Sequence, residues 1–477
     1  MLDSTRYRLA AALAGALAVA VYTGSWSNEL VTGDRLLVER AVETDSWSDL
    51  APLFDLVPVT PELGEPEIAT YRPVTALSFA LDARLWGNDP FAFHVTNAIW
   101  HALVVVCLAL LLARFLSPAA GFVGAALFAV HPVHVEAVAS LAGRAELLAG
   151  AAYVGALLLY VSRTRPLDAD GPALGSAITI ALLYLAAILA KETALTLPAV
   201  LFVVDSARGD IHFGRVGEYL RRRAVVYSAL FAAALGGLAL RYGALGGALF
   251  GASAGVFGPD EDVWTRVFTM LTVWPHYVRL LLAPLDLSPD YSPAVILPSH
   301  GVTPAAILGL ALVLAIFALA ALAWRRSPWA LAGPFWVAIT LLPASNLLYS
   351  SGFVLTETSL FLPSAGVALS VAALAESGFR RGRAARALVW SAALLVIAAF
   401  GARTVRQTPV WANSETVVRE ILRSHPESYR AHWLQGRELA AADRRPEALA
   451  AYARAVELWP HDERVWIDLT RLNQGWD

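Results

Sequence analysis

The chain has 477 residues, of which 57% are hydrophobic and only 16% charged, and its mean hydropathy is +0.56. These values exclude an ordinary soluble domain and indicate a membrane protein. The net charge of −3 argues against a nucleic-acid partner, and the single cysteine, Cys107, excludes an intramolecular disulfide.

Eleven apolar runs are each long enough, or nearly so, to cross a bilayer core of about 30 Å. The first run, Leu9–Val21, follows Arg6 and Arg8, and we expect an uncleaved anchor rather than a signal peptide because no sharp polar break ends it. The run at 193–206 is short and needs a thinned bilayer or a buried end. The predicted spans are 8–24, 94–114, 119–133, 145–161, 173–190, 193–206, 224–241, 302–324, 328–344, 359–375 and 387–402.

A further segment, Trp264–Ala283, is amphipathic and interrupted by Pro275, so we expect it to lie in the membrane interface. If it does not cross, the arginine-rich loops all fall on one side, which is cytoplasmic by the positive-inside rule. One further crossing at this segment would move the later arginine-rich loops to the other side, so the charge pattern favours about eleven spans. The arginines concerned are Arg163, Arg165, Arg208, Arg215, Arg221, Arg222, Arg223, Arg325, Arg326, Arg380, Arg381, Arg383 and Arg386.

The long polar loops then share the opposite, outer face. A transporter typically spreads polar residues through the midplane of two related halves, and we find no such repeat. An enzyme working at the outer membrane surface fits better, with a transporter or lipid flippase as a rival interpretation. We predict a transmembrane domain over 1–402, with a large first outer loop at 25–93, and a second domain over 403–477.

The second domain has the character of soluble helices. Five residues fall at the spacings of a tetratricopeptide repeat, in which small residues let two helices approach and a proline ends the second. These residues are Gly436, Ala448, Tyr452, Ala455 and Pro460. Helices are also expected at Ser414–Pro426 and Val465–Asn473. A tail with about one and a half repeats buries little surface of its own. We therefore expect it to dock on the membrane body or on a partner. The fold class is all-α.

Lys191 is the only lysine of the chain, and Glu192 follows it between two apolar runs. An ionisable pair at the end of a membrane segment faces a cavity or a partner more often than lipid, and an ammonium is a compact charge suited to phosphate. The alternative is a lysine that snorkels at the membrane boundary.

Two residues of the first outer loop are candidates for chemistry. Asp34, the acid nearest the exit of the first span, is a candidate general base for an acceptor hydroxyl, although its spacing alone favours a solvated loop acid or a helix cap. Arg72 precedes Pro73, which places it in extended backbone near a helix start. It either holds a phosphate or snorkels.

A dense polar patch, His131–Gly150, lies between two apolar spans. Its His131, His134 and Glu136 are potential metal ligands, but their spacing is not a known zinc signature, so a divalent metal is an open alternative that the sequence does not indicate, and no cofactor is assigned. Arg144 is suited to bidentate contact with a phosphate. Alternatively, it pairs with Glu146 or Glu136 to neutralise buried charge.

Eight short motifs follow one another along the chain. They are Tyr71-Arg72-Pro73, Phe93-His94 with Asn97, His131-Pro132 with His134 and Glu136, Gly143-Arg144-Ala145-Glu146, Lys191-Glu192-Thr193, Leu287–Ser292, Ala344-Ser345-Asn346 and Leu362-Pro363-Ser364. In this order they resemble the motifs of the transmembrane and tetratricopeptide-repeat O-mannosyltransferases and their bacterial relatives. The resemblance implies the GT-C glycosyltransferase architecture, a polyprenyl-phosphate sugar donor, mannose above all, and an acceptor hydroxyl on protein serine or threonine.

The resemblance also implies roles for single residues. Asp34 becomes the general base, and Arg72, Arg144 and Lys191 become the ligands of the donor phosphate. The supporting and sugar-binding residues are His131, His134, Glu136, Glu146, Glu192, Asp290, Tyr291 and Glu357.

The chain departs from the family pattern at two positions. Relatives often carry paired acids where this chain has Gly33-Asp34, and Glu-Arg where it has Glu357-Thr358. These departures support an alternative function, a non-catalytic membrane scaffold that recruits a protein partner through its tail. The preference for arginine over lysine indicates a bacterium with GC-rich coding, and so an inner-membrane protein with a periplasmic site and C-terminus.

Overall fold

The computed structural model describes residues 4–31, 34, 37–38, 57–58, 69–164, 173–211, 214, 216–247, 257, 262–292, 294–324, 327–348 and 353–474. This part of the chain is almost entirely helical, as predicted, apart from a short antiparallel pair of strands. Its elements are α1 (Ser4–Ala20), η1 (Thr23–Ser27), β1 (Val57–Pro58), β2 (Ala69–Thr70), α3 (Pro73–Trp86), α4 (Pro90–Leu112), α5 (Pro118–Ala129), η3 (Pro132–His134), α6 (Val135–Ala139), α7 (Arg144–Arg163), α8 (Leu174–Ala190), η4 (Glu192–Thr196), α9 (Leu197–Ala207), α10 (Val216–Ala244), α11 (Val263–Leu282), α12 (Pro304–Trp324), α13 (Pro328–Leu341), η6 (Leu342–Ala344), η7 (Thr358–Leu360), α14 (Phe361–Phe379), α15 (Arg383–Gln407), η8 (Thr408–Trp411), α16 (Ser414–Ser424), α17 (Tyr429–Ala441), α18 (Arg445–Leu458) and α19 (Glu463–Gln474).

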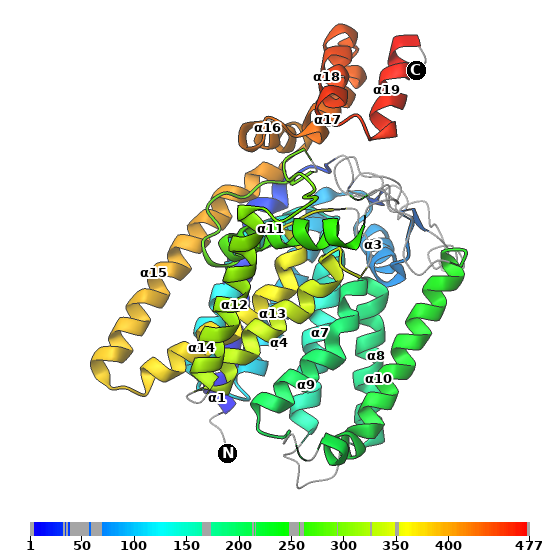
Figure 1. Ribbon diagram of the computed structural model, residues 1–477. Helices are drawn as coiled ribbons and strands as arrows, with labels where there is room; N and C mark the ends of the chain where they lie inside the picture. The colour runs from blue at the N-terminus through cyan, green and yellow to red at the C-terminus, as the bar shows by residue number, and fades with distance from the viewer. Residues whose placement is uncertain are drawn as a thin grey trace.

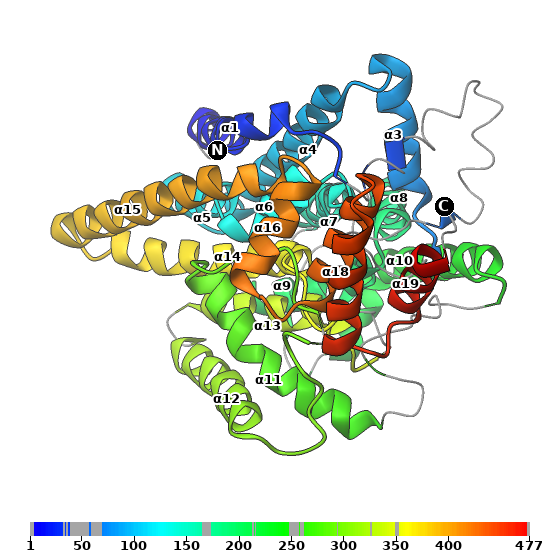
Figure 2. The same ribbon diagram turned by 90° about the horizontal axis from the view of Figure 1, so that it is seen from above.

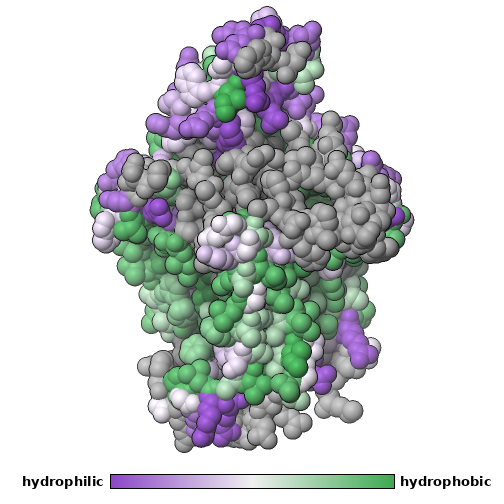
Figure 3. Space-filling view, turned by 90° about the vertical axis from the view of Figure 1, so that its right-hand side faces the viewer, coloured by the Kyte–Doolittle hydropathy of each residue, from purple (hydrophilic) through white to green (hydrophobic). Residues whose placement is uncertain are grey.

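The chain is a multi-pass membrane protein, and each predicted span falls on a helix. Within the described residues, seven helices are long and apolar enough to cross a bilayer, or eight if the pair that bends by 48° after α5 counts as one span. The eleven residues of α9 reach only about 16 Å. The count of eleven spans therefore stays a prediction. On the face shown in Figure 3, a broad apolar belt lies between two more hydrophilic ends.

The amphipathic segment forms α11, which includes Pro275. It is long enough for a membrane crossing but is not among the helices apolar enough to form one. Figure 1 shows it at the upper end of the bundle, and Figure 2 shows it beside α12. Its buried face, which includes Met270, Val273 and Tyr277, packs with apolar side chains of the connections at that end, such as Leu287 and Val354. The interfacial position expected from its pattern stays a prediction.

Two arginine-rich turns lie at the end of the molecule opposite the tail. The turns between α9 and α10 and between α14 and α15 are at the lower end, and α16–α19 stand above the upper end (Figure 1). Those two turns and the first turns of α10 carry Arg208, Arg221, Arg222, Arg380 and Arg381. Arg165, Arg215, Arg325 and Arg326 lie outside the described residues. The arginines of these turns thus share one end, as the charge pattern predicts, whereas other arginines, such as Arg72, lie at the end that bears the tail.

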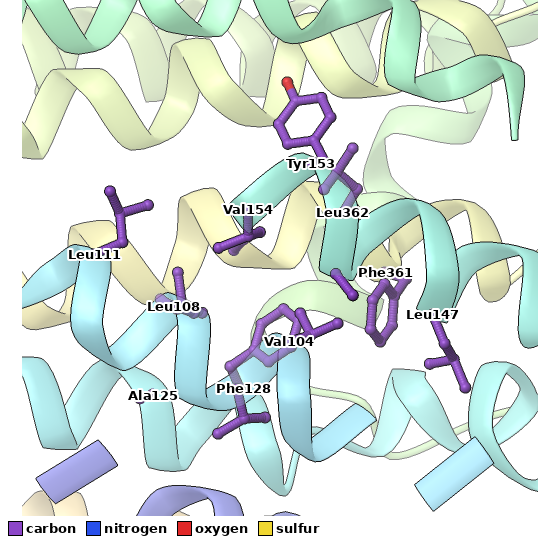
Figure 4. Close-up of a cluster of buried hydrophobic side chains, with 14 of the residues drawn as sticks. Val104, Leu108, Leu111, Ala125, Phe128, Leu147, Tyr153, Val154, Phe361 and Leu362 are labelled. Atoms are coloured by element: carbon purple, nitrogen blue, oxygen red, sulfur yellow. The ribbon is translucent and has the colours of Figure 1, made fainter. Parts of the chain in front are cut away.

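The core of the membrane body is formed by α4, α5, α7 and α14, whose apolar side chains interlock (Figure 4). Phe128 and Phe361, from helices far apart in the sequence, meet at 5.4 Å between ring centroids. Because lipid is as apolar as these side chains, close packing rather than removal from water holds such helices together.

The tail is helical in the segments where the sequence predicts helices. In the pair formed by α17 and α18, the ring of Tyr452 lies so close to Gly436 that an added Cβ would sit 2.5 Å from its Cδ1 atom. Ala448 and Ala455 are buried in the same pair. The expected flanking helices are α16 and α19. That this tail is a tetratricopeptide repeat stays a prediction.

The contact between α13 and α14 depends on two glycines. A Cβ added to Gly333 would overlap the Ser370 hydroxyl and the Gly366 carbonyl oxygen, and one added to Gly366 would lie 2.6 Å from the Gly333 carbonyl oxygen. We expect Gly333→Ala to lower the free energy of unfolding by about 1–3 kcal/mol, the usual cost of overpacking. Thermal unfolding in detergent measures this.

Gly155→Ala is the matched control, because nothing lies within 4 Å of the added Cβ in α7. An equal loss of stability in both variants would show that backbone effects, rather than the α13–α14 contact, are responsible.

Candidate active site

The first turn of α7 directs two opposite charges to different neighbours. Arg144 and Glu146 are two residues apart, so their side chains leave a helix of 3.6 residues per turn on nearly opposite sides. Arg144 points toward α3 and α4, where it meets Asp82 and Asn97. Glu146 points toward Lys191, at the end of α8. Two clusters therefore begin at one turn.

Arg144 is fully buried, and each nitrogen of its guanidinium has a protein partner. Its NH1 lies 2.6 Å from Asp82 Oδ2, its Nε donates to Asn97 at 2.7 Å, and its NH2 donates to the Phe93 carbonyl oxygen at 2.8 Å. The Phe79 ring lies 4.1 Å from its Cζ. This corrects two expectations, because Arg144 is not presented to a phosphate and pairs with neither Glu146 nor Glu136.

Asp34 is buried beside this pair. Its Oδ1 accepts the backbone N–H of Ala142 at 3.0 Å, just before α7 begins, and lies 3.5 Å from the Ser140 hydroxyl. Its negative charge also acts on Arg144. We name Asp34, Asp82 and Arg144 the acidic cluster, since it holds two carboxyl groups and one cation. Gly33, the first family departure, lies outside the described residues.

The second cluster joins five charged residues from α3, α7, η4 and α10. Lys191 Nζ lies 2.5 Å from Glu146 Oε1, Arg72 contacts Glu192 through two nitrogens at 3.0 and 3.4 Å, and Arg241 NH1 lies 3.6 Å from Glu192. We name these residues the cationic cluster, since three cations face two carboxylates. Burial opposes the ionisation of Glu192, but the charges of Arg72, Arg241 and Lys191 outweigh it and lower its pKa.

The cationic cluster keeps some access to its surroundings. The side chains of Arg72 and Lys191 are 19% and 16% exposed, whereas Arg144 has no exposed surface. Arg72 is the residue before the first turn of α3, but its backbone, with φ −135° and ψ 62°, is not in the extended region predicted before Pro73.

Arg241 is not among the site residues selected from the sequence. Arg241 lies at the end of α10 opposite Arg221, Arg222 and Arg223. Because the positive-inside rule favours arginines at only one end of an apolar span, an arginine at the other end could have marked this position as a candidate.

The histidine motif does not converge on one point. His131 Nε2 lies 3.0 Å from the Leu281 carbonyl oxygen, His134 Nε2 lies 2.8 Å from the Ser364 hydroxyl, and Glu136 accepts the Thr358 N–H at 3.1 Å. Across the described ranges, no group of three or more histidine, cysteine or acidic side chains is arranged to hold a metal. These residues join helices, and neither cluster includes them.

Glu357, Asp290 and Tyr291 meet at a different place. Glu357 Oε1 accepts the Ser288 N–H at 2.8 Å and the Tyr291 hydroxyl at 2.9 Å. Asp290 accepts the Ser428 hydroxyl of the tail at 2.6 Å. We name Leu287–Ser292 the connector. The contacts of these three side chains are structural, and none of the three joins the acidic or cationic cluster.

Comparison with known proteins supports the resemblance found in the motifs. No protein-family model matches. The chain is 30% identical to protein O-mannosyl-transferase TMTC1 of Homo sapiens over 441 residues, which cover 85% of this chain and 50% of that protein. It is 26% identical to TMTC3 of Mus musculus over 431 residues, covering 84% and 46%. The chain thus spans about half the length of the curated relatives it matches.

Two solved structures show a distant likeness. ArnT from Cupriavidus metallidurans, bound to undecaprenyl phosphate, aligns with a TM-score of 0.44 and 16% identity over 97% of this chain and 77% of that one. An oligosaccharyltransferase from Archaeoglobus fulgidus, tethered to an acceptor peptide, aligns with a TM-score of 0.43 and 14% identity over 93% and 58%. Both likenesses are too distant to carry a further conclusion.

The buried pair in the acidic cluster generates a stability prediction. Arg144→Met leaves Asp82 without its counter-charge, so we expect a loss of about 3–5 kcal/mol in the free energy of unfolding. The double variant Arg144→Met with Asp82→Leu removes both charges and should recover most of that loss. Thermal unfolding of the single and double variants tests this, and equal losses would contradict it.

The connector generates a pH prediction. Burial raises the pKa of Glu357 from 4.5 to about 8, against the effect of its hydrogen bonds from Ser288 and Tyr291. Between these pH values the folded protein holds a proton that the unfolded chain has released, so stability falls as the pH rises through this window. Glu357→Gln should flatten the fall, and an unchanged slope of melting temperature against pH would contradict this.

Proposed function

We propose that this chain is a membrane glycosyltransferase that moves a sugar, mannose by analogy with its relatives, from a polyprenyl-phosphate donor to an acceptor hydroxyl. One observation carries the proposal. A cluster with excess positive charge and a cluster with excess carboxylate begin at the same turn of α7, at the end of the molecule that bears the tail. Transfer from a lipid phosphate needs both kinds of group.

The cationic cluster would bind the donor phosphate. Arg72, Lys191 and Arg241 carry one positive charge more than Glu146 and Glu192 neutralise. The two glutamates hold the cations in place, which limits the cost of reorganisation when charge builds up on the leaving phosphate. The exposed fraction of Arg72 and Lys191 leaves room for that contact.

The acidic cluster would activate the acceptor. The acceptor oxygen attacks the anomeric carbon, the bond from that carbon to the phosphate oxygen breaks, and polyprenyl phosphate leaves with the electron pair. Asp34 takes the hydroxyl proton as general base. Arg144 orients Asp34 rather than touching the donor, since its nitrogens are already bound to protein groups.

The end opposite the tail carries the arginine-rich turns between α9 and α10 and between α14 and α15, and it would face the cytoplasm. The two clusters and the tail then lie in the periplasm if the host is a bacterium. The acceptor would be a serine or threonine hydroxyl of a protein, as the printed names of the relatives suggest.

The test uses the purified protein in nanodiscs with radiolabelled polyprenyl-phosphate mannose and polyprenyl-phosphate glucose offered in parallel. We expect Lys191→Ala and Arg241→Gln to weaken donor binding about tenfold or more, because each removes a phosphate contact worth about 1.4 kcal/mol. Asp34→Asn should keep binding and lose about 100- to 10,000-fold in turnover.

Arg380→Ala is the control, since this exposed arginine lies at the end opposite the tail. Full turnover in Asp34→Asn would remove Asp34 from the mechanism. Failure of the unmodified protein to bind either donor would instead favour the non-catalytic scaffold.

A further inference from the structure

Buried hydrogen bonds to Glu357 hold the connector, Leu287–Ser292, on the membrane body. Ser288 and Tyr291 both donate to the Glu357 carboxyl group, and all three residues are buried. Glu357 precedes Thr358, whose N–H is held by Glu136. The connector is therefore joined through one carboxyl group to the start of α14 and, through the next residue, to the histidine motif.

The other side of the connector holds the tail. Asp290 accepts the Ser428 hydroxyl at 2.6 Å and pairs with Arg430 at 3.5 Å, and both tail residues are buried. Ser288 Oγ lies 3.0 Å from both Ser424 Oγ and His425 Nδ1. These contacts converge on the end of α16 and the start of α17, where a carboxylate also suits the positive end of the helix dipole.

This attachment is more specific than apolar packing. Ser428 caps α17 by accepting the Ala431 N–H at 3.1 Å, so the residue that begins the helix is also the one bound to Asp290. A buried ion pair and a shared cap fix direction as well as distance, because both need aligned donors and acceptors. By contrast, Asp286 pairs with Arg279 at an exposed position, where such a pair contributes little.

We propose that Asp290 is a positioning residue that fixes the tail over the outer face and thereby presents a polypeptide acceptor to the active site. The claim that the tail presents an acceptor rests on the proposed function, whereas the claim that Asp290 fixes the tail does not. The tail then serves as a platform held at a set orientation, and Asp290 affects where a large acceptor lies rather than the transfer step. Transfer to a small acceptor that does not reach the tail should not depend on Asp290.

The structural arm of the test measures a distance. With Cys107→Ala as background, Asn88→Cys and Arg454→Cys place spin labels at exposed sites on the body and the tail. Electron–electron resonance should give one narrow distance distribution in the parent and a broad one in Asp290→Ala. Arg430→Ala should broaden it as much, and the double variant no further, because both remove the same joint.

The control is Asp286→Ala, which removes an exposed acid four residues earlier and should leave the distribution narrow. An unchanged distribution in Asp290→Ala would overturn the proposed joint. Equal broadening in Asp286→Ala would show that the effect is not specific to Asp290 and would overturn it as well.

The functional arm compares two acceptors, a serine- and threonine-containing polypeptide and a threonine tripeptide. Asp290→Ala should raise KM for the polypeptide about tenfold and leave kcat and tripeptide transfer unchanged. Equal changes for both acceptors, or no change for the polypeptide, would overturn the positioning role. If the parent consumes no donor, the proposed function and the acceptor role fail together, while the distance measurement still decides whether Asp290 fixes the tail.

Discussion

The buried ion pair between Arg144 and Asp82 is the constraint on which the end of the membrane body beneath the tail depends. A guanidinium with no exposed surface is tolerable only if its charge and all its donors are matched by protein groups. That requirement brings α3, the start of α4 and the start of α7 to one point. Asn97 strengthens the junction by accepting from Arg144 and donating to the Val138 and Ser140 carbonyl oxygens. Once the first turn of α7 is fixed, Glu146 can only point toward Lys191.

The acids and cations at the end that bears the tail have different roles. Glu136 accepts the Thr358 N–H, and Glu357 accepts the Ser288 N–H and the Tyr291 hydroxyl, and these contacts order the entry to α14. Lys191 and Arg72 are held by other glutamates yet remain partly exposed. A cation that is oriented by protein and still accessible suits an anionic ligand, because little reorganisation is needed when it binds. The second family departure, Thr358, donates its backbone N–H to Glu136 at 3.1 Å and its hydroxyl to Thr356 at 3.2 Å.

The orientation of the tail also depends on buried polar contacts. A pair of helices with one flanking helix on each side buries too little surface to be firmly placed by its own packing. Its orientation therefore depends on polar contacts with the body, of which those of Asp290 with Ser428 and Arg430 are the most buried. Tail and active-site end are consequently parts of one arrangement rather than independent modules.

Composition and periodicity by themselves determined the helices, the pairing of the tail helices and the common end at which the arginines of the α9–α10 and α14–α15 turns lie. These properties are local, since an apolar run or an amphipathic repeat acts on the residues that contain it. Partner choice was decided only by the tertiary structure. Sequence spacing favoured nearby acids for Arg144, whereas its counter-charge lies 62 residues away. The tertiary structure also brings Arg241 to the cationic cluster, and it places Asp290 against Ser428 and Arg430 of the tail rather than in either cluster. Charges in a low-dielectric interior pair with whichever opposite charge the packing of helices brings within reach, and that packing is not encoded in any one segment.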